Sequence, residues 1–279
     1  MLLKHGDSGD AVKALQRDLN KVGSILLVDG DFGPGTRDAV VDARTVLQRP
    51  GPPEADDALQ QALAAVADPL PSLSAAGVTF IARAEVSSPG EYRRSYDRPI
   101  WPGGESGVTI GIGYDLRFVD QAQLRGDWKD HLSEPELARL ATVLKLQGTA
   151  ALAAGLQDVE IPLGAAVTAF IARGLPQTIA LARSIFPQID TLPPPRQTAL
   201  TSLVYNRGTL LSDRDPQKQD RREMRAIKTL LAANKTDDVS EQFDAMSRLW
   251  DPRTQGGLVR RRHNEATLWR SGFTALQLA

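Results

Sequence analysis

A mainly helical protein with one small β hairpin is the fold class that this sequence of 279 residues predicts. Apolar residues recur at helical spacing along most of the chain, beginning with Val12, Leu15 and Leu19. Residues 100–112 break this pattern because they are rich in glycine and β-branched residues, which favour tight turns and extended strands. The hydrophobic content of 42% allows a sizeable core. We therefore expect one hairpin or small sheet inside an otherwise helical chain.

The N-terminal segment predicts a small bundle of three helices. Asp7 or Ser8 is expected to cap the first helix by accepting hydrogen bonds from its free backbone N–H groups. A tight turn at residues 31–35 precedes a second amphipathic helix. Residues 55–67 supply a third helix after the prolines and glycine of residues 50–53.

The rest of the chain is expected to form a second, larger domain. Residues 68–73 carry two prolines between helical stretches and are typical of a linker. We therefore place the first domain at residues 1–67, the linker at 68–73 and the second domain at 74–279. The second domain is expected to be mainly helical and to contain the hairpin.

Charge and residue types exclude several classes of partner. The 33 basic and 34 acidic residues give a net charge of -1, which argues against a nucleic-acid partner. The chain has no cysteine, so it has neither a disulfide framework nor a thiolate metal site. Its histidines, His5, His131 and His263, are far apart in sequence and no H-E-x-x-H helix accompanies them. We expect neither a metal nor another cofactor.

No membrane insertion is expected from the sequence. The N-terminus lacks an apolar run of signal-peptide length, and no later stretch is expected to reach the length that spans a bilayer. The prediction is a chain made in the cytoplasm that does not insert stably into a membrane.

The N-terminal bundle contains a dense pattern of glycines and apolar residues, G-x-x-G-x-x-V-x-x-L-Q followed by D-G-x-F-G-x-x-T-x-x-A-V. The residues that carry it are Gly6, Gly9, Val12, Leu15, Gln16, Asp29, Gly30, Phe32, Gly33, Thr36, Ala39 and Val40. This segment resembles the peptidoglycan-binding domain type 1 family. The resemblance implies a three-helix bundle whose partner is bacterial peptidoglycan. The alternative is that most of these residues only build turns and a core.

Glu85 and Thr109 are the first candidates for a catalytic site in the second domain. Glu85 ends the apolar run of residues 78–84, where a carboxyl group is partly desolvated, as suits a proton donor. Thr109 follows 24 residues later in the glycine-rich segment 107–116, where small residues let a ligand approach the backbone. An acid at a helix end, followed by a hairpin with a hydroxyl and a carboxylate, is the arrangement that glycoside hydrolysis needs. The alternatives are a solvated glutamate and a threonine that only favours a strand.

Three long segments of the second domain resemble one family. Residues 85–115, 199–208 and 257–269 contain T-I-G-I-G-Y, Y-N-x-G and G-L-x-x-R-R. They resemble the phage-type lysozymes of glycoside hydrolase family 24, including the bacteriocin pesticin. The resemblance implies an α+β lysozyme-like domain in which Glu85 is the general acid, Thr109 positions water and a second carboxylate completes the site.

Two aspartates compete for the role of the second carboxylate. Asp97 resembles the position that the compact phage lysozymes use, between the acid and the threonine. Asp115 lies six residues after Thr109, which resembles the arrangement in pesticin. The extra loop of residues 98–106 lengthens the spacing and favours Asp115. Asp115 is also a candidate N-cap for the segment that follows it.

Four further residues are candidates for substrate binding. Trp101 is a candidate platform for sugar stacking, with burial as the alternative. Tyr205 and Asn206 are candidates to stack on a sugar and to bond an acetamido group, with a helix core contact as the alternative. Arg261 and its two arginine neighbours are candidates to attract peptidoglycan carboxylates, and internal pairing with Glu265 is the alternative.

The function expected from these patterns is that of a modular muramidase, an endolysin that hydrolyses β-1,4 bonds between N-acetylmuramic acid and N-acetylglucosamine. The alternatives are a lytic transglycosylase, a cell-wall-binding protein without catalytic activity, and a secreted antibacterial effector with the same muramidase activity. The expected site of action is the periplasm, after delivery by a phage holin or an injection apparatus. We expect a monomer.

Overall fold

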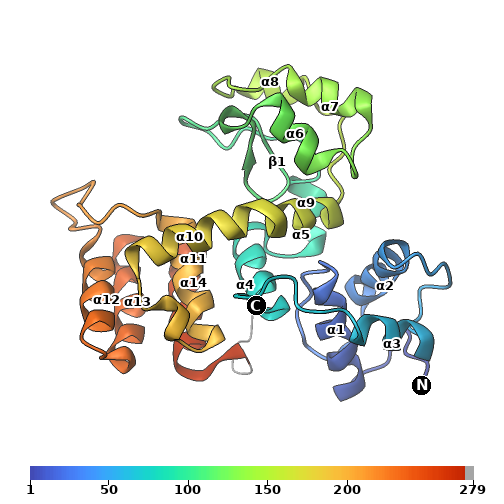
Figure 1. Cartoon of the computed structure of the whole chain (residues 1–279), viewed down its shortest axis with the longest axis horizontal. Helices are drawn as coiled ribbons and strands as arrows, with labels where there is room; N and C mark the ends of the chain where they lie inside the picture. Colours follow the sequence, from blue (N-terminus) through green and yellow to red (C-terminus); the bar gives the residue numbers. More distant parts are fainter. Residues whose placement is uncertain (274–279) are drawn as a thin grey trace. The chain divides into compact units, whose positions relative to one another are not determined.

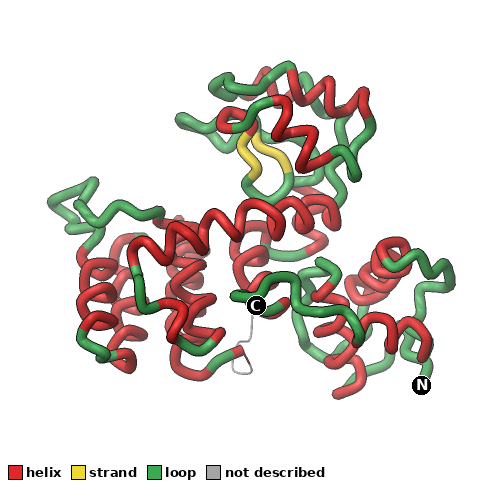
Figure 2. The backbone as a smooth tube through the Cα atoms, viewed as in Figure 1, coloured by secondary structure: helices red, strands yellow, loops and turns green. Residues whose placement is uncertain are grey.

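The computed structural model describes residues 1–273, which form two compact units. The first unit comprises Met1–Pro71 and Val78–Leu175, and the second comprises Ser72–Gly77 and Pro176–Ala279. Helices dominate both units, and the described residues contain one two-stranded antiparallel sheet (Figures 1 and 2). The predicted fold class, mainly α with one small hairpin, is therefore confirmed.

Three helices form the N-terminal bundle, as the sequence predicts. They are α1 (Asp10–Lys21), α2 (Pro34–Val46) and α3 (Asp57–Ala64). Their apolar faces meet in one core that includes Leu15, Leu19, Val40 and Leu59. Burial of these apolar faces is what stabilises helices as short as these in water.

The predicted cap of the first helix is wrong. Gly9 precedes α1, and no side chain accepts a hydrogen bond at its N-terminus. The carboxylate of Asp7 instead accepts from the backbone N–H of Lys4, at 2.8 Å. Ser8 forms a backbone bridge with Asp31. Both candidate caps therefore organise the chain before the helix, where local bonds of short polar side chains compete with capping.

Gln16 holds the turn between α1 and α2. Its side chain is 1% exposed, and its amide donates to Asp29, to the carbonyl of Asp31 and to the hydroxyl of Thr36. Its carbonyl oxygen accepts from the N–H of Gly30 at 2.9 Å. A buried amide with all of these partners fixes the turn, because removal of the side chain would take away a donor and an acceptor that the turn uses in the core.

The proline-rich connection between α2 and α3 is held by Arg44. Its guanidinium is buried and donates to the carbonyls of Arg49, Pro52 and Glu54, and to the carboxylate of Asp56. Asp56 in turn caps α3 by accepting from the N–H of Leu59. A segment that forms no regular structure therefore has its backbone carbonyls satisfied by one side chain.

The remainder of the first unit contains the hairpin, and its first helix begins with residues 75–77 of the second unit. Its elements are α4 (Ala75–Val86), α5 (Pro89–Ser95), β1 (Thr109–Ile110), β2 (Tyr114–Asp115), the 3₁₀ turn η1 (Leu116–Phe118), α6 (Gln121–Trp128), α7 (Glu134–Ala141), α8 (Ala150–Ala154) and α9 (Leu163–Ala169). Several of these helices begin at a side-chain cap, such as Asp120 at α6 and Thr149 at α8.

One long helical run contradicts the expectation that no stretch of the chain reaches the length that spans a bilayer. It passes from α9 through a π-helical turn, η2 (Phe170–Gly174), into α10 (Leu175–Ile185). The π-helical turn ends shortly before Pro176. Proline lacks a backbone N–H, and its ring collides with a backbone carbonyl of the preceding helical turn, which the wider π-helical turn accommodates. Leu163–Ile185 is, in the described part of the chain, long and apolar enough to cross a membrane. Half of its most apolar window is buried inside the protein, as in a core helix.

The second unit is a group of packed helices. After α10 it contains η3 (Ile189–Thr191), α11 (Pro194–Arg207), α12 (Arg222–Ala232), η4 (Thr236–Asp238), α13 (Val239–Met246), η5 (Ser247–Leu249) and α14 (Pro252–Ser271). Helix α14 packs against α11 and α13, and α13 also packs against α12 (Figure 1).

Replacing Arg44 with methionine is expected to destabilise the N-terminal bundle. The change removes the donors of three backbone carbonyls, so the free energy of unfolding should fall by roughly 1–3 kcal/mol. Urea denaturation followed by circular dichroism measures this fall. The control is Arg37→Met on α2, because Arg37 is half exposed and pairs, among the described residues, only with its neighbour Asp38. Equal stability of the two variants would contradict the role of Arg44.

Candidate functional site

The hairpin brings Thr109 and Asp115 face to face. In the antiparallel register of β1 and β2, Thr109 lies opposite Asp115 and Ile110 lies opposite Tyr114. The turn between the strands is short, with Gly111 at φ 57° and Gly113 at φ 71°. Glycine is the residue that adopts this left-handed conformation most readily. The glycines that the sequence places around Thr109 therefore close the hairpin.

The side chains of Thr109 and Asp115 lie on the same face of the hairpin. The backbone N–H and carbonyl of Thr109 bond to Ile100 instead of Asp115, at 2.8 and 2.9 Å. Thr109 and Asp115 are therefore a non-hydrogen-bonded pair, the type in which opposite side chains come closest. Thr109 is 8% exposed. Its hydroxyl lies 3.5 Å from the carbonyl of Gly107, at the outer limit of a hydrogen bond.

The carboxylate of Asp115 is held by backbone donors. Both of its oxygens accept from the N–H of Gly107 at 3.1 Å, and Oδ1 also accepts from the N–H of Arg117 at 2.9 Å. The bond to Arg117 caps the 3₁₀ turn η1. Asp115 is half-buried, so the same side chain that caps the turn also stands beside Thr109.

Gly107 makes this arrangement possible, a role that the sequence analysis missed. A side chain at position 107 would collide with Oδ1 of Asp115 and with the backbone of Arg117. Gly148 has a similar role, because a side chain there would collide with the ring of Trp101 and the backbone of Gly107. Requirements of this kind come from contacts between distant segments, so glycine counts alone do not reveal them.

Trp101 lies in the loop that leads to β1. Its ring is half-buried, and its Nε1 is buried without a hydrogen-bond partner among the described residues. The loop is closed by the pairing of Ile100 with Thr109 and by a bond from the N–H of Gly148 to the carbonyl of Ser106, at 2.9 Å. The ring is therefore neither fully buried nor fully exposed, and sugar stacking by Trp101 stays a prediction.

Glu85 lies in the last turn of α4. Its side chain is half-buried, and the same helix buries Val78, Ile81 and Val86. The helix ends at Val86 because the next residue, Ser87, adopts φ 61°, in the left-handed region. This position agrees with the expected helix end next to an apolar face.

Asp97 lies in the loop after α5 and is half-buried. Its backbone carbonyl accepts from the N–H of Ile161 at 2.8 Å. The hydroxyl of Tyr92 donates to the carbonyl of Ile161, also at 2.8 Å. Burial, and to a smaller extent the negative charge of Asp97, raises the pKa of the Tyr92 hydroxyl. Asp97 therefore belongs to the surroundings of Tyr92, whereas Asp115 belongs to the hairpin of Thr109.

The remaining candidates lie in the second unit. Tyr205 and Asn206 occupy the last turn of α11 and are half-buried. Oδ1 of Asn206 is buried without a hydrogen-bond partner among the described residues. It is therefore an acceptor that an N–H donor can still use.

Arg261 is buried against Glu265. Its guanidinium donates to the hydroxyl and carbonyl of Ser202 at 3.3 and 3.0 Å, and lies 3.5 Å from Oε1 of Glu265. Arg262 pairs with the same oxygen at 2.8 Å. Burial raises the pKa of Glu265, while the two arginines oppose this rise. The internal pairing that the sequence left as an alternative is thus present at Arg261 and Arg262.

Comparison with known families identifies the N-terminal bundle. Residues 8–43, which contain α1, the turn held by Gln16 and most of α2, match the family described as putative peptidoglycan binding domain. The chain therefore carries a peptidoglycan-binding domain at its N-terminus, and the match supports peptidoglycan as its partner. No curated protein matches the chain.

Replacing Gly107 with alanine is expected to displace Asp115. The added methyl group collides with the carboxylate, so the stability of the chain should fall by about 1–3 kcal/mol. The amide of Arg117 should also exchange with solvent faster, because it loses its acceptor. Urea denaturation and amide hydrogen exchange measure the two effects. The control is Gly126→Ala in α6, where an added methyl group meets no atom within 4 Å. Unchanged exchange at Arg117 in the Gly107 variant would refute the collision.

Proposed function

We propose that this protein is a muramidase that hydrolyses the β-1,4 bond between N-acetylmuramic acid and N-acetylglucosamine. The observation that carries the proposal is the pairing of Thr109 with Asp115 across the hairpin. It places a hydroxyl and a carboxylate side by side, as activation of a water molecule requires. The N-terminal peptidoglycan-binding domain supports the choice of polymer.

In the proposed reaction Glu85 protonates the glycosidic oxygen that leaves. Its half-buried position at the end of α4 suits a proton donor. Thr109 and Asp115 orient the water that attacks, or stabilise the positive charge that develops on the sugar ring. The backbone bonds of Gly107 and Arg117 hold the Asp115 carboxylate in one orientation, so it needs little rearrangement during the reaction.

Asp115 is the better candidate for the second carboxylate. It shares a face of the hairpin with Thr109, whereas the charge of Asp97 acts on Tyr92. The N-terminal domain would keep the enzyme on its insoluble substrate, because tethering raises the local concentration of the polymer. A phage endolysin or a secreted antibacterial effector, acting in the periplasm after delivery, would use the same chemistry.

A lytic transglycosylase is the second candidate function. It also needs Glu85 as an acid, but it forms an anhydro-sugar end without the attack of water. The held carboxylate beside Thr109 favours hydrolysis, because a transglycosylase needs no second carboxylate. A wall-binding protein without activity is the third possibility, and the same experiment separates all three.

Replacing Glu85 with glutamine is expected to lower the rate of sugar release from purified peptidoglycan by about 100-fold or more, because the amide cannot donate the proton. Mass spectrometry of the released fragments should show reducing N-acetylmuramic ends from the wild type. Anhydro ends would identify a transglycosylase, and no fragments at all would identify a binding protein. The control is Glu134→Gln, an exposed glutamate paired with Arg125 in the same unit.

The two aspartates are expected to respond differently to replacement by asparagine. Asp115→Asn should lower the rate of sugar release at least about 100-fold, while Asp97→Asn should lower it less than about tenfold. The initial rates of dye release from labelled cell walls measure both. A larger loss in the Asp97 variant would assign the second carboxylate to Asp97.

A further inference from the structure

The connection between α11 and α12, residues 208–221, is organised by one carboxylate. Oδ1 of Asp220 accepts from the backbone N–H groups of Arg214 and Asp215, at 2.8 and 3.1 Å. Oδ2 faces two guanidinium groups, with Nη2 of Arg207 at 3.4 Å and Nε of Arg221 at 3.7 Å. Both of these distances are long for a charge-assisted hydrogen bond. Nη2 of Arg207 also donates to the backbone carbonyl of Asp220, at 2.6 Å. The Asp220 carboxylate therefore shapes the loop but makes no short contact with either guanidinium.

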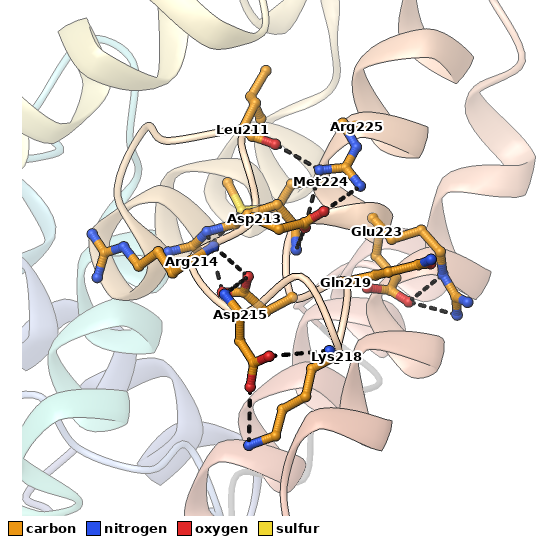
Figure 3. Close-up of polar contacts among 12 residues, drawn as sticks. Leu211, Asp213, Arg214, Asp215, Lys218, Gln219, Glu223, Met224 and Arg225 are labelled. Carbon is orange, nitrogen blue, oxygen red and sulfur yellow. Dashed lines mark hydrogen bonds and ion pairs between the residues drawn. The ribbon is translucent and has the colours of Figure 1, made fainter.

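The other acids of this region are occupied by other cations. Figure 3 shows Asp213 bonded to the guanidinium of Arg225, and Asp215 paired with Lys218. Glu223 is 1% exposed and pairs with Arg222 and Arg248, at 2.9 and 2.7 Å.

Arg207 and Arg221 consequently have donors to spare. Arg221 is 2% exposed, and among the described residues its side chain contacts the sulfur of Met224 at 3.6 Å and the carboxylate of Asp220 at 3.7 Å. Nε of Arg207 and Nε of Arg221 are both buried without a hydrogen-bond partner among the described residues. A guanidinium carries five N–H donors, and buried donors are normally satisfied. An anion would use them.

The electrostatics of Arg207 and Arg221 also favour a negative ligand. Burial, followed by the charge of Arg221, lowers the pKa of Arg207. Burial also lowers the pKa of Arg221, and the exposed Arg214 adds its charge to both. A lowered arginine pKa means that the charged form is less favoured here than in water. A negative ligand would offset that cost.

Charge is distributed unevenly along the chain. Residues 176–279 contain sixteen basic and eleven acidic residues, whereas residues 1–175 contain seventeen basic and twenty-three acidic residues. The net charge of -1 therefore conceals a positive C-terminal part, to which Arg207, Arg214 and Arg221 belong. A positive surface favours association with an acidic ligand.

The ring of Trp250 provides a second feature of a binding site. It is half-buried, and the guanidinium carbon of Arg207 lies 5.2 Å from its ring centre. An aromatic ring beside a charged group can contact the apolar part of a ligand while the guanidinium binds its anionic group. The arginines at 261 and 262, in contrast, already share Glu265.

We propose that Arg207 and Arg214 bind the free carboxylates of the peptide that peptidoglycan carries, and that the positive charge of the buried Arg221 adds to the attraction. This inference rests on peptidoglycan being the substrate, as proposed above. Carboxylate is the expected group because the planar guanidinium binds it through two parallel hydrogen bonds. The sequence made Arg261 a candidate for binding peptidoglycan carboxylates, whereas this proposal places carboxylate binding at the connection between α11 and α12.

The test follows Trp250 in the full chain labelled with 5-fluorotryptophan, with its ¹⁹F resonance assigned through Trp250→Phe. The probe is the soluble disaccharide of N-acetylglucosamine and N-acetylmuramic acid with its peptide, with carboxylates either free or amidated. The free form should shift the Trp250 resonance to saturation. Arg207→Gln should weaken this binding about tenfold, as loss of a bond between charged groups does. Amidation of the probe should have a similar effect.

Two further variants keep the test independent of folding. Arg214→Gln alters an exposed side chain and should weaken binding roughly threefold, because it removes charge without removing a buried contact. Arg253→Gln is the control, since the Arg253 side chain is 89% exposed and, within residues 1–273, pairs only with Asp251. It should bind the probe as the wild type does.

Several outcomes would overturn the inference. Equal binding of the amidated probe would exclude carboxylate recognition, and wild-type binding by both Arg207→Gln and Arg214→Gln would exclude these arginines. Inorganic phosphate that binds as tightly as the free probe would reduce the site to a general anion site. Digestion of cell walls by the wild type is measured in parallel. Failure of that digestion overturns the muramidase, whereas an unresponsive Trp250 with normal digestion overturns only the carboxylate site.

Discussion

The antiparallel pairing of Thr109 with Asp115 is the interaction on which the candidate site depends. Two strands of two residues each cannot be stable alone, because so short a ladder buries little apolar surface. The pairing of Ile100 with Thr109 and the bonds from Gly107 and Arg117 to Asp115 supply the missing support. The hairpin is thus held by its surroundings, and the hydroxyl and carboxylate are fixed on one face as a consequence.

In the second unit, three acidic side chains each lie beside two arginines. Glu265 lies between Arg261 and Arg262, Glu223 lies between Arg222 and Arg248, and Asp220 lies between Arg207 and Arg221. Glu265 and Glu223 each make one contact of 2.8 Å or less with an arginine, whereas the contacts of the Asp220 carboxylate with arginines are 3.4 and 3.7 Å. Buried charges are stable only when they are paired and hydrogen-bonded. The weakest of the three pairings is for this reason the one to which a ligand can contribute most.

The proposed function involves two kinds of contact with peptidoglycan. The N-terminal domain belongs to a peptidoglycan-binding family and holds its turn through the single buried amide of Gln16. The proposed catalytic groups lie on α4 and the hairpin, and the proposed carboxylate site lies after α11. A chain that binds an insoluble polymer through one domain and hydrolyses it at another site gains from tethering, because tethering raises the local concentration of the polymer at the second site.

The sequence by itself determined the helical class, the three helices of the N-terminal bundle, the hairpin around Thr109 and the turn glycines Gly111 and Gly113. These features follow from periodicity and from backbone preferences that act over a few residues, so they can be predicted locally. Only the tertiary structure decided that Asp115 stands opposite Thr109 while Asp97 acts on Tyr92, that Gly9 precedes α1 without a side-chain cap, and that Glu265 pairs with Arg261. Each of these outcomes depends on which distant groups compete for the same donor or acceptor, and that competition is resolved only when the chain is folded.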